Sequence, residues 1–380
     1  MAGLYIHIPF CASRCIYCGF YSTTLLPLQD RYVDALCREM ELRDVMPINT
    51  VYIGGGTPSQ LSSDNLRKLL YNIYKVYGLN STGNLCKEIT MECNPDDINE
   101  ALCATISELH INRVSMGAQT FSNQRLRFLH RRHSARQVTA AVKQLRQHGI
   151  SNISIDLMFG FPGETLSDWE RDIDEALALN VEHISAYSLM YEEGTPLYEN
   201  RDKWREIDEE LSLSMYEMLI DKLTSAGYEH YEISNFAKPG FRSLHNSSYW
   251  DGTPYIGIGA SAHSYDIVSR QWNISDIKRY IESIERGIRP CDYEVIDEAT
   301  RYNDLITTAL RTRDGVNIEA LPEVFKKHIL ACAEPYIQQK KVSLRDNRLR
   351  LTREGLFISD SIMSDLMWVT SCPAHPDKSL

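Results

Sequence analysis

The chain has 380 residues, of which 43% are hydrophobic and 24% charged, enough to bury a sizeable core over two or three domains. Its 51 acidic and 40 basic residues give a net charge of -11, which argues against a general nucleic-acid surface because phosphate binding needs concentrated Lys and Arg. No apolar stretch reaches the roughly 20 residues that span a bilayer.

Three cysteines stand close together near the N-terminus. Cys11, Cys15 and Cys18 lie in the sequence Cys-Ala-Ser-Arg-Cys-Ile-Tyr-Cys. Thiolates this close can reach one inorganic centre, and three of them leave a four-iron cluster with one iron that has no protein ligand. The spacing therefore predicts a [4Fe-4S] cluster with a reactive open iron.

The sequence gives less support to other roles for these cysteines. A structural zinc site wants four ligands, so His7 or a distant residue would have to complete it. A thioredoxin-like pair would use Cys15 and Cys18 and leave Cys11 without a role. Disulfides are disfavoured because the N-terminal residues show neither a basic region nor an apolar region typical of export. We therefore expect a cytoplasmic protein.

Short strand-like runs alternate with amphipathic stretches along the first half, which is typical of repeated βα units. Six such units predict an α/β fold built on a partial (β/α)6 barrel, with the active site at the carboxyl ends of its strands. The predicted strands are 4–8, 50–53, 88–92, 113–117, 152–158 and 183–189, and the predicted helices are 30–42, 64–77, 98–109, 135–148 and 166–179.

The pattern changes in the second half of the chain. A segment rich in Gly, Pro and aromatic residues is followed by a predicted linker at 290–293. Beyond it, a helix at 300–310, a hairpin at 342–352 and a final helix at 353–366 predict a small winged-helix-like α+β domain. A wing often reads DNA, but the acidic surroundings favour a packing or lid role. The predicted domains are 1–230, 231–290 and 291–380.

Several motifs resemble one known family. Cys-x3-Cys-x2-Cys is the cluster motif of the radical S-adenosylmethionine superfamily, and the flanking segment 5–10 is similar to its coproporphyrinogen-oxidase-like branch. Further motifs resemble that branch in the same order along most of the chain. They are Gly-Gly-Gly-Thr-Pro-Ser at 54–59, Glu-Cys-Asn-Pro at 92–95, Gly-Ala-Gln-Thr-Phe at 117–121, Ile-Asp-Leu-Met-Phe-Gly-Phe-Pro-Gly at 155–163, His-Asn-Ser-Ser-Tyr-Trp at 245–250 and Gly-Ile-Gly-Ala-Ser-Ala-His at 257–263.

The resemblance implies S-adenosylmethionine as a cofactor, chelated to the open iron through its amino and carboxylate groups. Gly55 and Gly56 lack side chains, so the backbone can approach the methionine moiety, and the nearby Thr57 adds a hydroxyl. Polar side chains at strand ends can bind the rest of the cofactor. These are Glu92, Gln119 and Asp156, to which the resemblance adds Tyr5, Phe20 and Arg131.

One position separates the members of this branch. The dehydrogenase acting on coproporphyrinogen III carries a fourth cysteine two residues after the third and a longer segment before the cluster. This chain has Phe20 there and ten residues before Cys11. Both departures point to the heme-chaperone type of the branch. The motif characteristic of that type, His-Asn-x-x-Tyr-Trp, is present at 245–250. It makes His245, Tyr249 and Trp250 the heme candidates, with an imidazole for the iron and flat aromatic rings for the macrocycle.

The leading hypothesis is a heme-binding protein that transfers heme to acceptor apoproteins, membrane-associated ones among them. The alternatives are the decarboxylating dehydrogenase and a radical enzyme acting on another substrate. Whether S-adenosylmethionine is cleaved, whether the chain forms a homodimer, and whether His245, His263 or His7 ligates the iron are left open by the sequence.

Overall fold

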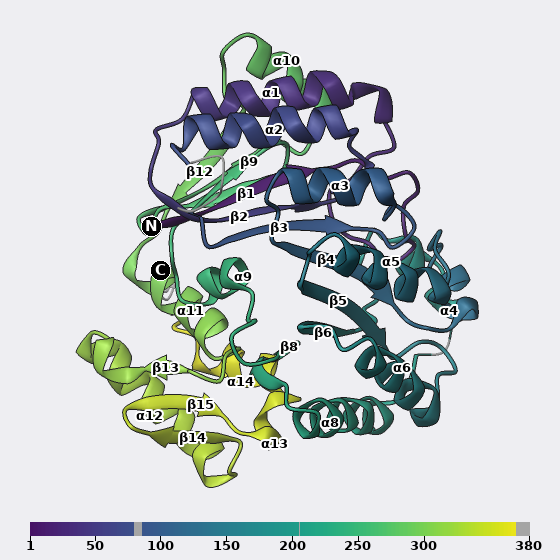
Figure 1. Ribbon diagram of the computed structural model, residues 1–380. Helices are drawn as coiled ribbons and strands as arrows, with labels where there is room; N and C mark the ends of the chain where they lie inside the picture. The colour runs from purple at the N-terminus through teal and green to yellow at the C-terminus, as the bar shows by residue number, and fades with distance from the viewer. Residues whose placement is uncertain (80–85, 205, 370–380) are drawn as a thin grey trace, which may run out of the picture. The chain divides into compact units, whose positions relative to one another are not determined.

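The computed structural model describes residues 1–79, 86–204 and 206–369, which form two compact units (Figure 1). The first unit contains Met1–Tyr249 and Thr253–Val295. The second contains Trp250–Gly252 and the residues from Ile296 onward. Most of the segment 231–290 therefore packs with the first unit, and the three predicted domain boundaries stay predictions. Residues 370–380 of the last predicted domain lie outside the described part.

Six parallel strands form the centre of the first unit, paired in chain order from β1 to β6. Every strand and helix predicted for the first 190 residues is confirmed, and with them the partial (β/α)6 fold. The strands are β1 (Ala2–Ile8), β2 (Ile48–Gly55), β3 (Glu88–Cys93), β4 (Arg113–Gln119), β5 (Asn152–Phe159) and β6 (His183–Ser188); the helices are α1 (Gln29–Glu41), α2 (Ser63–Val76), α3 (Glu100–Glu108), α5 (Ala135–Gln147) and α6 (Leu166–Ala178).

Local sequence explains where these elements begin and end. In β1, every residue except Tyr5 is buried, as expected for a strand covered on both faces. Helix α6 starts in a capping box, in which the Thr165 hydroxyl accepts from the Asp168 N–H while the Asp168 carboxylate accepts from the Thr165 N–H. Neighbouring helices pack in sequence, α1 on α2, α2 on α3 and α3 on α5, along the outer face of the sheet (Figure 1).

Further strands, which the sequence did not predict, extend this sheet at both ends. The order is β12-β11-β10-β9-β1-β2-β3-β4-β5-β6-β8-β7. Only β9 among the added strands pairs in parallel, with β1; the others pair antiparallel. They are β7 (Glu229–Glu232), β8 (Asn235–Ala237), β9 (Tyr255–Ile258), β10 (His263–Tyr265), β11 (Ser269–Asn273) and β12 (Cys291–Val295).

The linker predicted at 290–293 is wrong. Most of it belongs to β12, which pairs with β11 from Cys291 opposite Asn273 to Val295 opposite Ser269. Strand β12 is the last in the sheet and its residues after Cys291 are exposed. Its sequence, Cys-Asp-Tyr-Glu-Val, does alternate apolar and polar residues, so a strand signal was present, although the segment is only five residues long and mostly exposed.

The loops and helices between these strands complete the first unit. Helix α9 sits near the barrel interior because the Glu88 carboxylate accepts from the N–H groups of Leu244 and His245 at its start. The remaining elements are α4 (Asn123–Phe128), α7 (Pro196–Glu199), α8 (Glu209–Ser225), α9 (Leu244–Trp250) and α10 (Ile277–Glu285), with short 3-10 turns η1 (Leu26–Leu28), η2 (Pro58–Gln60) and η3 (Arg201–Lys203).

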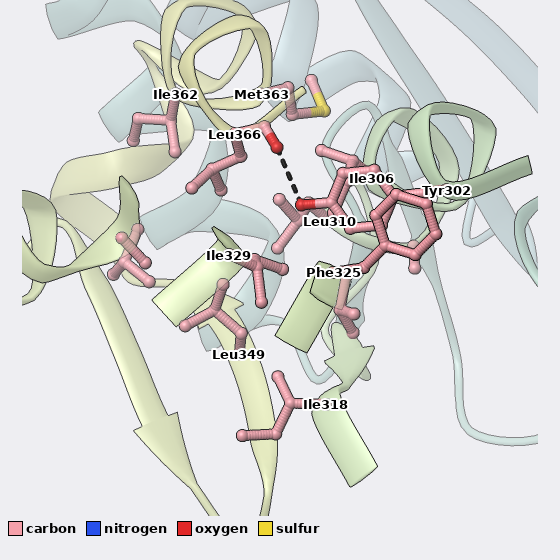
Figure 2. Packing of buried hydrophobic residues seen from close by; sticks show 14 residues of the cluster. Tyr302, Ile306, Leu310, Ile318, Phe325, Ile329, Leu349, Ile362, Met363 and Leu366 are labelled. Atoms are coloured by element: carbon pink, nitrogen blue, oxygen red, sulfur yellow. Dashed lines mark hydrogen bonds between the residues drawn. The ribbon is translucent and has the colours of Figure 1, made fainter. Parts of the chain in front are cut away.

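The second unit is the predicted small domain with an antiparallel sheet, ordered β13-β15-β14. Its hairpin turns at Asp346 and Asn347, both with positive φ, as a tight hairpin turn requires. In its core the rings of Tyr302 and Phe325 stack 4.6 Å apart, and the Tyr302 hydroxyl donates to the Leu366 carbonyl at 2.8 Å (Figure 2). The elements are α11 (Glu298–Ala309), β13 (Val316–Asn317), η4 (Ile318–Ala320), α12 (Glu323–Gln338), β14 (Val342–Arg345), β15 (Arg348–Leu351), α13 (Arg353–Leu356) and α14 (Ser359–Leu366).

Candidate functional site

A cavity of about 600 Å³ opens at the carboxyl ends of the parallel strands of the first unit, where ligands of such sheets bind. Residues from β2 to β6 and from the loop after β1 line it. The structure thus brings the predicted cluster and S-adenosylmethionine residues together, with Tyr5 as the exception; the predicted heme residues His245, Tyr249 and Trp250 do not line this cavity. The predicted residues at the cavity are Cys11, Cys15, Cys18, Phe20, Gly55, Gly56, Thr57, Glu92, Gln119, Arg131 and Asp156.

The loop after β1 carries the three cysteines and is closed by backbone hydrogen bonds. The Thr23 N–H donates to the Pro9 carbonyl at 2.7 Å, and the Cys11 N–H donates to the Thr23 carbonyl at 2.9 Å. All three thiols are half-buried and face the cavity. Burial raises the pKa of the Cys11 and Cys18 thiols, so a bound cation or cluster is needed to hold them as thiolates near neutral pH.

These thiols fit an iron-sulfur cluster better than a single ion. Among the described residues, no three His, Cys, Asp or Glu side chains surround one ion-sized position. A cubane cluster does not need such a position, because each thiolate binds a different iron. The Cys11 Sγ lies 3.5 Å from the Thr57 hydroxyl, so the cysteine loop and the glycine-rich segment meet at the cavity.

Arg131, in the segment after α4, contacts the loop that carries the cysteines. Its Nη1 lies 3.6 Å from the Cys15 Sγ, and its Nη2 donates to the Asn94 side-chain oxygen and to the Gly117 carbonyl, both at 2.7 Å. Its Nε is buried and has no hydrogen-bond partner within the described chain. The guanidinium is thus fixed in place with one donor left for a ligand.

The packing around the glycines at 54–56 leaves little room for a side chain. Gly55 has φ of 115°, a conformation that L side chains rarely adopt, and a Cβ there would lie 2.6 Å from the His7 ring. A Cβ on Gly56 would lie 2.7 Å from the Pro9 carbonyl carbon. The absence of side chains therefore lets β2 approach the segment leading to Cys11, while contact of these glycines with S-adenosylmethionine stays a prediction.

Glu92 is held at the cavity by two hydrogen bonds. Its carboxylate accepts from the Tyr52 hydroxyl at 2.7 Å and from the Gly55 N–H at 3.0 Å. Burial raises the pKa of Glu92 to about 7, against the smaller lowering effect of these bonds. Tyr52 also lines the cavity, although the sequence did not single it out; its position two residues before Gly54 on β2 was the available signal.

Asp156 and Gln119 lie on neighbouring strands. Burial raises the pKa of Asp156 to about 6. Gln119 has φ of 65°, at an irregularity in the pairing of β4 with β5, and this turns its side chain to the cavity. Two carboxyl groups that are readily protonated and one amide can thus donate or accept hydrogen bonds from a polar ligand.

Tyr5 lies away from the cavity. Its hydroxyl is 2.9 Å from the His7 Nδ1, and its ring stacks on Tyr52. The His7 Nε2 lies 3.0 Å from the Tyr21 carbonyl, which can only accept, so Nε2 carries the proton and Nδ1 accepts from Tyr5. Tyr5 therefore supports the residues that line the cavity, and its predicted direct contact with the cofactor stays a prediction.

His245 is fully buried in α9. Its Nδ1 lies 2.8 Å from the Thr50 hydroxyl and its Nε2 lies 2.8 Å from the Tyr249 hydroxyl, while its ring stacks on Tyr52. Burial lowers the pKa of His245 to about 3, so the ring is neutral. A heme iron could bind it only after one of these two hydrogen bonds is broken and the ring is uncovered; the predicted ligation stays a prediction.

The other heme candidates are dispersed. Trp250 belongs to the second unit, where the Arg311 guanidinium lies 5.3 Å from its ring. His7 has both nitrogens hydrogen-bonded, as described above. His263 is exposed on β10 and its ring stacks on Trp272. Neither His7 nor His263 lines the cavity.

Arg113 is a further residue that the sequence reasoning missed. It is 1% exposed at the start of β4, lines the cavity, and its Nε and Nη1 have no hydrogen-bond partner in the described part of the chain. Its guanidinium counteracts the burial that raises the pKa of Glu92 and of Asp156. Only its position on an inward-facing strand register could have identified it.

Comparison with known proteins agrees with this geometry. Residues 5–176 match the family model of the radical SAM superfamily, and residues 296–358 match that of the HemN C-terminal domain. The solved structure of coproporphyrinogen III oxidase (HemN) from Escherichia coli superposes with a TM-score of 0.83 over 96% of this chain and 90% of that chain, at 21% identity. At this identity the likeness shows the fold alone.

Two curated relatives carry the same name. The heme chaperone HemW of Lactococcus lactis is 33% identical over 372 residues, which cover 96% of each chain. The heme chaperone HemW of Bacillus subtilis is 37% identical over 338 residues, which cover 87% of this chain and 88% of the relative. The chain therefore belongs to the HemW heme chaperone family within the radical SAM superfamily.

Proposed function

We propose that this chain binds heme and delivers it to acceptor hemoproteins, with a [4Fe-4S] cluster and S-adenosylmethionine held in the cavity of the first unit. The observation that carries the proposal is the relation to HemW proteins over nearly the whole chain, with identity above 30%. Phe20, at the cavity in place of the dehydrogenase's fourth cysteine, supports it.

Cys11, Cys15 and Cys18 would hold the cluster, which supplies a low-potential electron and an open iron. Arg131 would offer its unpartnered Nε to the carboxylate of S-adenosylmethionine, while Glu92, Gln119 and Asp156 would bind its polar groups. Gly55, Gly56 and Thr57 would shape the wall beside it. The proposal does not require that the cofactor be cleaved.

The proposed acceptors are heme-free apoproteins, including membrane-associated ones, and nucleic acid is not among the proposed partners. No helix in the described part of the chain is long and apolar enough to cross a membrane. The nine described cysteines form no disulfide. Because accessible thiols and iron-sulfur clusters persist in reducing compartments, we propose that the protein acts in the cytoplasm.

The competing function is the anaerobic conversion of coproporphyrinogen III. The test uses the full chain, reconstituted anaerobically with iron and sulfide, and runs a heme titration beside an assay for protoporphyrinogen formation. We expect stoichiometric heme binding and no conversion. The Phe20→Cys variant should not gain conversion either, because a catalytic site needs more than one residue in place. Robust conversion by the unmutated chain would overturn the proposal.

A further inference from the structure

Three large apolar side chains at the cavity are exposed to solvent. Phe20 is 72% exposed, Met190 is 64% exposed and Tyr187 is 43% exposed, and all three line the cavity. Large apolar residues are mostly buried, and a group of them exposed around a concave site is typical of ligand or partner binding. This group forms an apolar rim, by which we mean Phe20, Tyr187 and Met190.

The rim is built by the cysteine loop and by the end of β6 with the loop after it. Phe20 lies in the cysteine loop, Tyr187 lies on β6, and Met190 follows β6 in the loop that leads to α7. A Cβ placed on Gly19 would lie 2.2 Å from a carboxylate oxygen of Glu192, so the two loops are in contact one residue before Phe20 and two residues after Met190. All three rim residues thus line one cavity of the first unit, on two segments that are in contact.

The chemistry of heme complements the side chains of this rim. Its macrocycle is flat and apolar on both faces, its iron accepts an axial ligand, and a methionine thioether is one of the side chains that ligate heme iron in proteins. Aromatic rings such as Phe20 and Tyr187 pack on flat π systems. In contrast, His245 and His7 are buried with both ring nitrogens hydrogen-bonded.

We propose that heme binds at this rim, with the Met190 thioether as an axial ligand and the macrocycle against Phe20 and Tyr187. The proposal rests on the proposed heme-chaperone function and names the site that would serve it. An exposed site at the cavity mouth suits a chaperone, because cargo held there can leave without opening a core.

Charge at the mouth fits the heme carboxylates. Arg14 lies in the cysteine loop, lines the cavity and is exposed, and its guanidinium has no hydrogen-bond or ion-pair partner within the described residues. Arg132, also at the cavity, is already paired with Asp96 at 2.9 Å and Asp97 at 2.8 Å. Arg14 is therefore the cation placed to bind a heme propionate.

The test compares Met190→Leu with the matched variant Met158→Leu, since Met158 also lines the cavity but is buried. Both keep the apolar volume and remove the sulfur. Ferric and ferrous heme are titrated into the full, reconstituted chain. We expect Met190→Leu to lose the charge-transfer absorption of thioether-ligated ferric heme, to lower the heme reduction potential and to weaken ferrous heme binding about tenfold. Met158→Leu should match the unmutated chain.

Two further arms decide between ligands. His130 is an exposed histidine that also lines the cavity and could ligate the iron instead. If His130→Ala or His245→Gln abolishes the axial signature while Met190→Leu leaves it unchanged, the inference is overturned. Arg14→Gln should reduce the preference for heme over heme dimethyl ester, which lacks the carboxylates.

If the unmutated chain binds no heme, the proposed function itself fails. If it binds heme with an unchanged spectrum in Met190→Leu, only the Met190 assignment fails.

Discussion

The Nη1 of Arg131 lies 3.6 Å from the Sγ of Cys15, while the same guanidinium is tied to Asn94 and Gly117. The Arg131 guanidinium thus links the cysteine loop to the end of β4. Because its Nε has no partner, we expect Arg131→Met to weaken S-adenosylmethionine binding about tenfold or more, the effect of a lost charge-assisted hydrogen bond. Calorimetry on the reconstituted chain measures it.

The control for Arg131 is Arg127→Met, which removes an exposed cation that does not line the cavity. It should leave affinity unchanged. Equal losses in both variants would show that general charge, and not the placement of Arg131, attracts the cofactor.

Each cluster cysteine should be indispensable. Changing Cys11, Cys15 or Cys18 to Ala removes one of three thiolates, and among the other described cysteines only Cys93 lines the cavity. The Cys93 thiol is buried, and burial holds its pKa well above the ordinary value, so it is a poor substitute. We expect loss of the cluster absorption and of iron after anaerobic reconstitution.

Cys37→Ala is the matched control for these variants, since Cys37 is half-buried and lies in α1 away from the cavity. It should bind about four irons per chain, as a single cubane requires. Retention of that iron content in the three cluster variants would refute the assignment.

Gly56→Ala should distort the cysteine loop and lower both stability and iron content. The added Cβ would lie 2.7 Å from the Pro9 carbonyl carbon, two residues before Cys11. We expect a loss of about 1–3 kcal/mol in the free energy of unfolding and a lower iron content, because backbone must shift to accept the methyl group. Urea unfolding and iron analysis measure both.

Gly78→Ala provides the comparison. Gly78 also resists a side chain because its φ is 64°, but nothing lies within 4 Å of its Cβ position. That variant should lose about 1 kcal/mol of stability and keep its iron. Normal iron content in Gly56→Ala would show that the contact with Pro9 is unimportant for the loop.

Glu92 should make the cofactor-free protein less stable as pH rises. Burial raises its folded pKa to about 7, whereas the unfolded carboxyl has an ordinary pKa near 4.5. The folded state then holds a proton that the unfolded state has lost, so stability is full below the unfolded pKa and falls as pH rises to about 7. Since Glu92 faces an open cavity, we expect a fall of about 2 kcal/mol between about pH 5 and pH 8.

In Glu92→Gln this part of the pH dependence should disappear, because the amide does not titrate. Glu193→Gln, at an exposed position, should retain it. Urea unfolding curves at the two pH values give the difference. A wild-type slope that survives in Glu92→Gln would mean that another group is responsible.

The elements that the sequence predicted well are those with strong periodic signals. Buried strands such as β1 and capped helices such as α6 carry their signals locally, so their positions could be read from the chain. Strand β12 is short and exposed, and its alternating sequence alone does not distinguish an edge strand from a linker; the pairing with β11 decides it. Long-range pairing of this kind leaves little trace in the residues themselves.

The same contrast between local signals and long-range contacts holds for the residues of the site. Strand-end residues such as Glu92 and Gln119 were predictable because parallel strands place their carboxyl ends together. The burial of His245 was not, because it depends on Glu88 capping α9 and on Thr50 and Tyr249 bonding the ring. These contacts join residues far apart in sequence.

The most direct test of the proposed function is heme transfer itself. The heme-loaded, reconstituted chain is mixed with a heme-free b-type hemoprotein, and the absorption spectra of both are followed, with heme-loaded serum albumin as a non-specific donor. We predict that heme leaves this chain for the acceptor faster than it leaves albumin. Heme that stays on the chain, or an acceptor that gains it no faster than from albumin, would contradict the account.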